Sequence, residues 1–218
     1  MRTQIAYTIL IIGAVLIGLW VSNILFDLKV PQYISRKIGH GMGGMGFLLC
    51  GFIYPSGWIP LFISAGFVML LAGARLVKPS AFRGVGGTGR SDNVLAEVYF
   101  PLSALPVIYV GWVWLNHPWE TIACLLFMAW GDCVTGIVRS QVYGHAVKGI
   151  WGSVAMLIVC LVISLALVPT FWVGAVASVV ATIAEYVSGD VGLLTWADDN
   201  WTIPIVSGLT MLGLMVIF

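Results

Sequence analysis

Long apolar runs fill most of this sequence and decide what the chain can fold into. Each run is close to the roughly 20 residues that a helix needs to cross the hydrocarbon core of a bilayer. Only 9% of the residues are charged and 60% are hydrophobic, with a mean hydropathy of +1.03, whereas soluble domains carry about 25% charged residues. The sequence therefore predicts an all-α, polytopic transmembrane helical bundle.

About eight spans are expected, separated by proline, glycine and charged residues. They are Ile5 to Phe26, Ile38 to Tyr54, Trp58 to Leu76, Val94 to Leu115, Thr121 to Val138, Ile150 to Val168, Phe171 to Ser188, and Thr202 to Phe218. These spans use up residues 1–218, so we expect a single integral membrane domain and no soluble domain. The first run is too long for a removable signal segment and lacks a small-residue cleavage site, so it should stay as the first helix.

Proline and cysteine positions add detail to this expectation. Pro101 and Pro106 fall inside the fourth run and should kink that helix, which a membrane tolerates when neighbours bind the freed carbonyls. Cys50, Cys124 and Cys160 lie inside apolar runs without the paired spacing of a zinc site or a disulfide framework. We expect these three cysteines to pack in the core.

The loops between the runs alternate in charge. The first, third and fifth loops, together with Arg75 at the end of the third run, hold nine of the ten Lys and Arg residues, and the second, fourth and sixth loops hold none. The positive-inside rule makes the basic loops cytoplasmic and places both termini on the non-cytoplasmic side. The net charge of +1 gives no indication of a nucleic-acid partner.

Acidic residues gather on the same side as the basic ones. Eight of the nine, all except Glu120, belong to that side or to helix ends that approach it. The positive-inside rule says little about Asp and Glu, so the acids need a second cause. A metal-bound, polyanionic substrate at the cytoplasmic face would supply one, and the active site is expected to face the cytoplasm.

Two carboxylates fall within apolar runs. Asp132 lies in Gly131-Asp132-Cys133-Val134-Thr135-Gly136, and Glu185 lies in the seventh run. An ionisable residue inside a membrane helix is costly and indicates a functional site with a partner. The alternative for Asp132 is a structural ion pair with a neighbouring Lys, or a helix cap.

A basic segment rich in small residues opens the sixth run. In Lys148-Gly149-Ile150-Trp151-Gly152-Ser153 an ammonium group and small residues stand at a helix N-terminus, where free N–H groups and the helix dipole favour phosphate. Arg139 begins the loop before it. The alternative is an interfacial Lys that reaches water, with Gly serving helix packing.

Three further segments carry candidate ligands. Arg36-Lys37-Ile38-Gly39-His40 places Arg36 and His40 on one helix face; it indicates either a site or a basic topology signal. Asp198-Asp199-Asn200 offers oxygen ligands for a hard cation or an Asx cap on the last helix. The segment from Gly84 to Ser91 matches a G-x-G-x-x-G pattern but lacks a preceding strand, so it is a flexible loop or an anion-binding nest over a nucleotide.

Together these segments resemble the motifs of the CTP-dependent lipid kinases. The motifs are Arg36-Lys37-x-x-His40, Gly131-Asp132 with Gly136, Lys148-Gly149-x-x-Gly152-Ser153 and Asp199-Asn200-x-x-Ile203-Pro204. The family includes dolichol kinase, phytol kinase and the CTP-dependent diacylglycerol kinase, and it is more distantly similar to the phosphatidate cytidylyltransferases. The chain departs from the family at Cys133 and Val134, where Ala and Ser are usual, and at Trp151, where an acidic residue is usual.

The resemblance implies transfer of the γ-phosphate of CTP to the hydroxyl of a long-chain lipid alcohol such as a polyprenol, dolichol, phytol or diacylglycerol. Asp132 and Asp199 would hold Mg²⁺, and Asp132 or Glu185 would take the alcohol proton. The nucleotide would be bound by Arg36, Lys37, His40, Arg139, Lys148, Gly149, Ser153 and Asn200.

Two other functions stay open at this point. One is cytidylyl transfer to a lipid phosphate, and the other is a small ion-coupled transporter that uses Asp132 and Glu185 as a relay. Gly41, Gly43, Gly44 and Gly46 favour close helix packing, within one subunit or between the subunits of a homo-oligomer.

Overall fold

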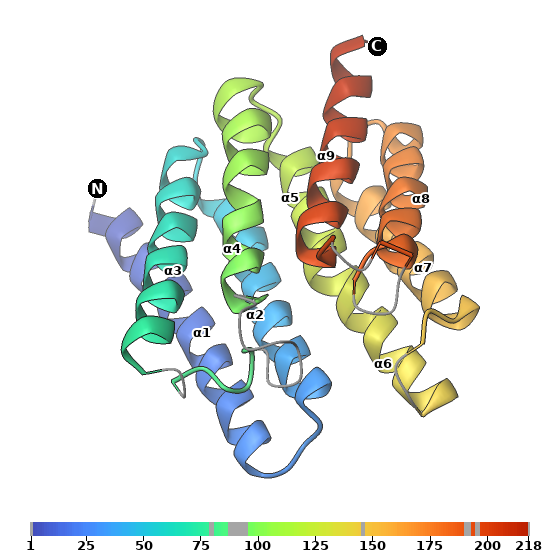
Figure 1. Ribbon diagram of the computed structural model, residues 1–218. Coiled ribbons are helices and arrows are strands. Elements are labelled where there is room, and N and C mark those ends of the chain that lie inside the picture. Colours follow the sequence, from blue (N-terminus) through green and yellow to red (C-terminus); the bar gives the residue numbers. More distant parts are fainter. Residues whose placement is uncertain are drawn as a thin grey trace.

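The computed structural model describes residues 2–78, 81–86, 96–144, 147–189, 193–194 and 197–217. Every regular element in this part of the chain is a helix, and no strand occurs in it (Figure 1). The helices are α1 (Arg2–Asp27), α2 (Gln32–Ile53), α3 (Trp58–Val77), α4 (Ala96–Val107), η1 (Ile108–Trp114), α5 (Pro118–Leu126), η2 (Phe127–Gly131), α6 (Asp132–Tyr143), α7 (Ile150–Leu167), α8 (Phe171–Val187) and α9 (Asp199–Ile217).

Each of the eight expected apolar runs is mainly helical where the structure describes it, and the chain is a multi-pass integral membrane protein. Five helices among the described residues are long and apolar enough to cross a membrane: Thr3–Asp27, Trp58–Val77, Pro118–Tyr143, Ile150–Leu167 and Asp199–Ile217. A sixth, α8, is apolar but shorter. Eight spans and the membrane side of the termini therefore stay predictions, although both termini lie at the same end of the bundle (Figure 1).

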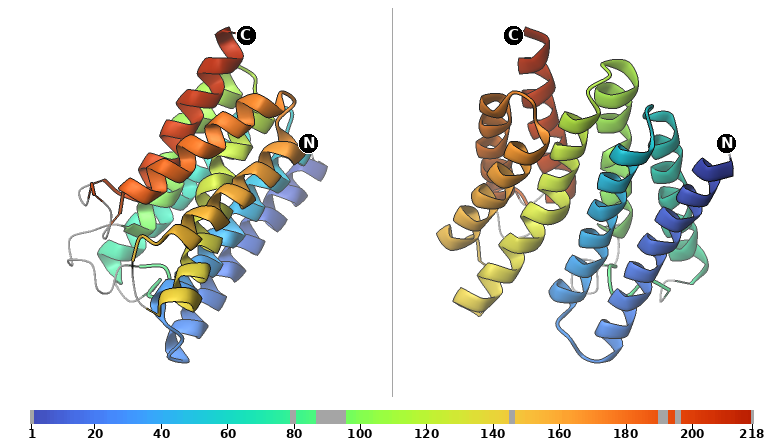
Figure 2. Two further views of the ribbon diagram at one scale, coloured as in Figure 1. Left: turned by 90° about the vertical axis from the view of Figure 1, so that its right-hand side faces the viewer. Right: turned by 180° about the vertical axis from the view of Figure 1, so that it is seen from behind.

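The continuous helix formed by α5, η2 and α6 occupies the centre of the bundle. All side chains from 122 to 129 are at most 1% exposed, as expected for a helix that is apolar on every side. It packs against α2, α7 and α9, while α1 lies on α2 and α3 lies on α4. The helices run alongside one another in both views of Figure 2. Cys50, Cys124 and Cys160 are free and buried in this core, as predicted.

Two segments of this bundle are π-helical. The segment η1 begins at Ile108, directly after the two prolines of α4, and η2 ends at Gly131, directly before Asp132. A π-helical turn contains one extra residue, and such turns are rare and concentrate at functional sites. The extra residue in η2 therefore sets the direction in which Asp132 points.

The glycines of α2 serve packing within the subunit. A Cβ at Gly43 would overlap Phe100, one at Gly44 would overlap Ala129 and Trp130, and one at Gly46 would touch Val15. Close approach of α1, α4 and the central helix to α2 thus accounts for these three glycines. Homo-oligomerisation stays a prediction.

Candidate functional site

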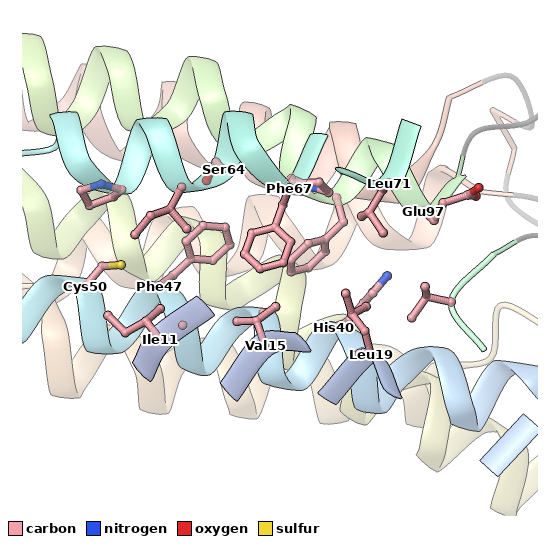
Figure 3. A pocket seen from close by; sticks show the side chains of 18 residues that line it. Ile11, Val15, Leu19, His40, Phe47, Cys50, Ser64, Phe67, Leu71 and Glu97 are labelled. Atoms are coloured by element: carbon pink, nitrogen blue, oxygen red, sulfur yellow. The ribbon is translucent and has the colours of Figure 1, made fainter. Parts of the chain in front are cut away.

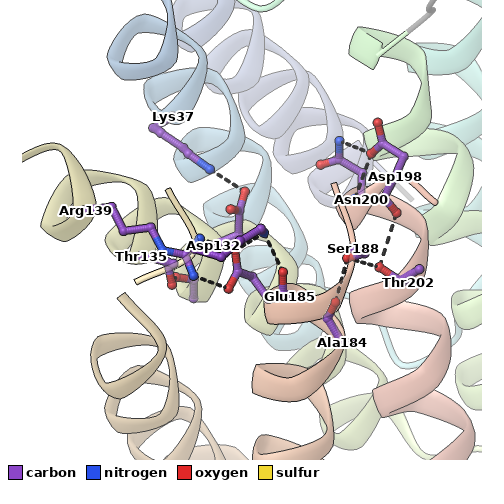
Figure 4. Close-up of polar contacts among 12 residues, drawn as sticks. Lys37, Asp132, Thr135, Arg139, Ala184, Glu185, Ser188, Asp198, Asn200 and Thr202 are labelled. Atoms are coloured by element: carbon purple, nitrogen blue, oxygen red, sulfur yellow. Dashed lines mark hydrogen bonds and ion pairs between the residues drawn. The ribbon is translucent and has the colours of Figure 1, made fainter. Parts of the chain in front are cut away.

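Charged and polar side chains from α2, α6, α8 and the start of α9 lie near one another (Figure 4), and Lys148, just before α7, joins them. We call Lys37, Asp132, Arg139, Lys148, Glu185 and Asp199 the charged cluster. Its three cations and three carboxylates balance in charge, and they come from positions up to 162 residues apart in the sequence. In an apolar environment such groups are stable only when each charge is paired or hydrogen-bonded.

Glu185 lies at the centre of the charged cluster and is 1% exposed. Arg139 Nη1 and Nη2 donate to its two carboxylate oxygens over 2.6 and 2.9 Å, which is the bidentate geometry that binds a carboxylate most strongly. Lys148 Nζ donates to Glu185 Oε1 over 2.6 Å and to the backbone carbonyl of Glu185 over 2.5 Å. These contacts fasten the start of α7 to the end of α8 and to α6.

Asp132 is 6% exposed and forms an ion pair with Lys37 through Oδ2. Its Oδ1 accepts no hydrogen bond from a described residue. The charges of Asp199 and Glu185 also act on Asp132, so the three carboxylates belong to one electrostatic unit. Asp132 thus forms an ion pair with a Lys, which was the alternative to a functional role for this residue. The partner, Lys37, is 95 residues away in sequence and belongs to a candidate motif.

Polar groups at the start of α9 extend the site beyond the charged cluster. Asp198 Oδ1 accepts from the backbone N–H and from Nδ2 of Asn200, over 2.9 and 2.8 Å. Asn200 is 1% exposed, and its Oδ1 has no hydrogen-bond partner among the described residues. Thr202 donates to Ser188 over 2.8 Å and so links α9 to the end of α8.

Gly189 lies where the start of α7, the end of α8 and the start of α9 come together. Its φ is +83°, a backbone conformation that L side chains rarely adopt. A Cβ at this position would lie 3.2 Å from Asp199 Oδ2 and 3.6 Å from Lys148 Nζ. The carboxylate and the ammonium group therefore face the same small space beside the Gly189 backbone.

The oxygen atoms of the site fit Mg²⁺ bound together with a nucleotide. No group of three or more His, Cys, Asp or Glu side chains that could hold a metal ion occurs among the residues the structure describes. Mg²⁺ normally takes only one or two carboxylates and completes its coordination with phosphates and water. Asp132 and Asp199 are the carboxylates that could hold such an ion, and Oδ1 of Asn200, which has no hydrogen-bond partner among the described residues, is an oxygen of the right chemistry.

The other predicted residues lie around the charged cluster. Ser153 Oγ is buried without a partner near the start of α7, and Gly149 precedes that helix, where it contacts the Tyr143 ring. Arg36 is half-buried and forms no ion pair with a described residue. His40 is 3% exposed and stacks on Phe100 with ring centroids 4.6 Å apart, so it lies on a neighbouring face of α2.

Some candidates lie outside the described residues. These are His145, Arg90, Asp92, Asp190 and positions 87–91 of the glycine-rich loop. The described start of that loop packs on α1 and α2, since Gly84 donates to Asn23 Oδ1 over 2.8 Å and accepts from Ser35 over 3.1 Å.

We did not predict from the sequence that Arg139 pairs with Glu185 inside the site, or that Glu97 is buried outside it. Arg139 was assigned to phosphate, but both of its terminal nitrogens bind Glu185. The signal was available, because two ionisable residues inside apolar helices need each other as partners. Glu97 was counted only as one of the clustered acids, although it is 5% exposed and lines a pocket.

Comparison with family models, with curated proteins and with solved structures found no match for the chain.

Proposed function

We propose that this protein is a membrane-embedded kinase that transfers the γ-phosphate of CTP to the hydroxyl of a long-chain lipid alcohol. The observation that carries the proposal is the convergence of Asp132, Lys148 and Asp199, one from each of three separated motifs. The order of those motifs resembles the CTP-dependent lipid kinases. The surrounding apolar helices would give an acceptor lipid access to the site from the membrane.

Phosphoryl transfer requires charge neutralisation and alignment more than covalent chemistry from the protein. Lys148 is the cation best placed to meet the β- and γ-phosphates, because its Nζ lies beside Asp199 at the start of a helix. Arg139 orients Glu185, which in turn fixes Lys148. Bound Mg²⁺ would neutralise phosphate charge, and Asp132, Asp199 and Asn200 are the residues that would hold it.

The hydroxyl of the acceptor attacks the γ-phosphorus, the bond to the β-phosphate oxygen breaks, CDP leaves, and the hydroxyl proton passes to a carboxylate. Asp132 suits that role better than Glu185. Both oxygens of Glu185 already accept hydrogen bonds from cations, whereas Oδ1 of Asp132 accepts none from a described residue. The site faces the cytoplasm in this proposal, because basic residues concentrate in the loops at its end of the bundle.

The proposal is tested with purified protein in lipid nanodiscs, Mg²⁺, and CTP labelled at either the α- or the γ-phosphate. Phytol, a polyprenol and diacylglycerol serve as acceptors. We expect label from γ-labelled CTP in at least one lipid, with CDP as the second product. Label from α-labelled CTP with release of pyrophosphate would make the protein a cytidylyltransferase, and no labelled lipid from any acceptor overturns the proposal.

The Asp132→Asn variant removes both the proton acceptor and a metal ligand while keeping the side-chain shape. We expect the rate of lipid phosphorylation to fall about 100-fold or more. Glu120→Gln is the matched control: Glu120 is also buried, at 4% exposed, but it pairs with His117 at the opposite end of the bundle. A Glu120 variant as inactive as the Asp132 variant would mean that the loss reflects general destabilisation.

A further inference from the structure

A long apolar pocket lies between α1, α2, α3 and α4, on the side of α2 away from the charged cluster (Figure 3). Its cavity volume is about 60 Å³, and together with space that is open to the surroundings the hollow measures about 640 Å³, so an occupant would lie partly in the surrounding lipid. Its walls include Ile11 and Val15 of α1, Phe47 of α2 and Phe67 of α3. Such walls select a hydrocarbon occupant over a polar one.

The pocket is about as deep as one leaflet of a membrane. It follows α2 from His40 to Cys50, and ten residues of helix advance about 15 Å. The hydrocarbon core of a bilayer is about 30 Å thick. One chain that enters at the polar end would therefore reach the middle of the membrane.

One end of the pocket carries a buried carboxylate with an unsatisfied acceptor, and Ser64 is a second polar group, farther along the pocket wall. Glu97 is 5% exposed; Arg75 Nε lies 3.8 Å from its Oε1, and its Oε2 has no hydrogen-bond partner among the described residues. His40 lies at the same end of the pocket (Figure 3). A buried carboxylate oxygen without a donor is costly, and a hydroxyl group would supply the donor.

The polar end of the pocket adjoins the charged cluster through α2. Successive helix residues are rotated by about 100°, so Gly39, Gly43 and Cys50 face the pocket. Lys37 and Gly44 face the central helix, where they contact Asp132 and Trp130. His40 lies between these two faces, about 60° around the helix from Lys37. A group held beside His40 is thus separated from the candidate phosphate site by α2.

A second apolar crevice connects this region with the lipid. It lies between Thr8 and Ile12 of α1 and Phe62 and Leu70 of α3. Ile63 and Phe67 line both the crevice and the pocket. Because the crevice walls are apolar, a hydrocarbon chain can pass from the bilayer into the pocket without leaving an apolar environment.

We propose that the pocket holds the single hydrocarbon chain of a lipid alcohol, with its hydroxyl donating to Glu97 and its chain directed toward Cys50. The chain enters between α1 and α3. That this alcohol is the phosphate acceptor rests on the proposed kinase function, in which the hydroxyl leaves Glu97 and reaches Asp132 before phosphoryl transfer. Glu97 also sets the substrate class, because its carboxylate attracts a neutral hydroxyl and repels the phosphate of a lipid phosphate. The pocket should therefore bind a lipid alcohol more tightly than a lipid phosphate.

Binding is tested without nucleotide, using hexadecanol that carries a photoactivatable diazirine in mid-chain and protein in phosphatidylcholine nanodiscs. We expect labelled peptides from α1, α2 and α3 that include pocket residues, and competition by unlabelled hexadecanol. Hexadecyl phosphate should compete about tenfold less well. Label spread over the outer faces of the helices and insensitive to hexadecanol overturns the proposal.

Two variants sharpen this test. Val15→Trp fills the middle of the pocket and should lower the competed label about tenfold. Met69→Trp adds the same ring on the outer face of α3, where Met69 is 70% exposed, and should leave the label unchanged. If Val15→Trp does not fold, Ser64→Leu at another wall position replaces it. Equal labelling of the pocket variant and the control contradicts the proposal.

The Glu97→Gln variant tests the substrate class. It keeps the size of the side chain and removes its charge, so hexadecyl phosphate should compete nearly as well as hexadecanol. Unchanged selectivity would show that Glu97 does not choose the acceptor. These experiments test the kinase proposal and the pocket proposal separately. If the pocket is labelled but no alcohol is phosphorylated, the kinase proposal is wrong. If the Val15→Trp variant phosphorylates lipid at the normal rate, the pocket proposal is wrong.

Discussion

At the scale of single residues, Glu185 is the most constrained charge in the molecule. It is nearly inaccessible and receives hydrogen bonds from two cations on different helices. Such a network adds little net stability against an apolar replacement, but the loss of one member leaves the others buried and uncompensated. Its value therefore lies in positioning Lys148 and Arg139.

We expect Glu185→Gln to lower the free energy of unfolding by about 3–5 kcal/mol, because it leaves two buried cations without a counter-charge. Denaturation in mixed micelles measures the effect. The double variant Glu185→Gln with Arg139→Gln should lose less than the sum of its single variants, since the two residues share one interaction. Strict additivity would mean that the ion pair contributes nothing.

Gly189 and Gly144 form a matched pair of residues. Both have positive φ, at +83° and +67°, but a Cβ at Gly144 would meet nothing within 4 Å. Gly189→Ala and Gly144→Ala should each lower the free energy of unfolding by about 1–2 kcal/mol. Only Gly189→Ala should weaken CTP binding, measured by calorimetry, because its methyl group enters the space between Asp199 and Lys148. Equal CTP affinity in both variants would place the nucleotide elsewhere.

At the scale of helices, the sequence predicted much of the structure because the membrane leaves few choices. An apolar run in a bilayer must bond its backbone internally, and each of the eight runs is mainly helical where the structure describes it. The π-helical segments η1 and η2 were not predicted, because an extra residue in a turn leaves no mark in hydropathy. Only the prolines at 101 and 106 indicated a disturbance near η1.

The contact between α6 and α7 also depends on one residue. A Cβ at Gly152 would overlap Arg139, which is held in place by Glu185. Gly152→Ala should therefore destabilise the protein by about 1–3 kcal/mol and lower CTP-dependent activity by displacing Arg139. Gly73→Ala in α3 is the control, since a Cβ there would meet nothing within 4 Å. Denaturation of both variants in micelles measures their free energies of unfolding. Equal values would contradict the close packing of Gly152 against Arg139.

At the scale of the whole molecule, charge segregation predicted which residues would meet but not how they pair. The motifs at the starts of α2, α7 and α9 were expected at one end of the bundle, because successive loops lie on alternate sides of the membrane. The partners Lys37 and Asp132 are 95 residues apart, and hydropathy fixes the depth of a residue but not its rotation about the helix axis. The pocket beside His40 was likewise hidden, because its apolar walls resemble any lipid-facing surface.

The orientation of the bundle is open to a direct measurement. Asp27 and Ser56 are exposed residues on opposite sides of α2 in the sequence: Asp27 ends α1 beside the first basic loop, and Ser56 lies in the uncharged second loop. The positive-inside rule predicts that the basic loop is cytoplasmic. In intact cells expressing otherwise cysteine-free protein, a membrane-impermeant maleimide should label Ser56→Cys at once and Asp27→Cys only after permeabilisation. The reverse pattern would place the charged cluster on the outer face of the membrane, where cytoplasmic CTP could not reach it. That result would contradict both the predicted topology and the kinase proposal.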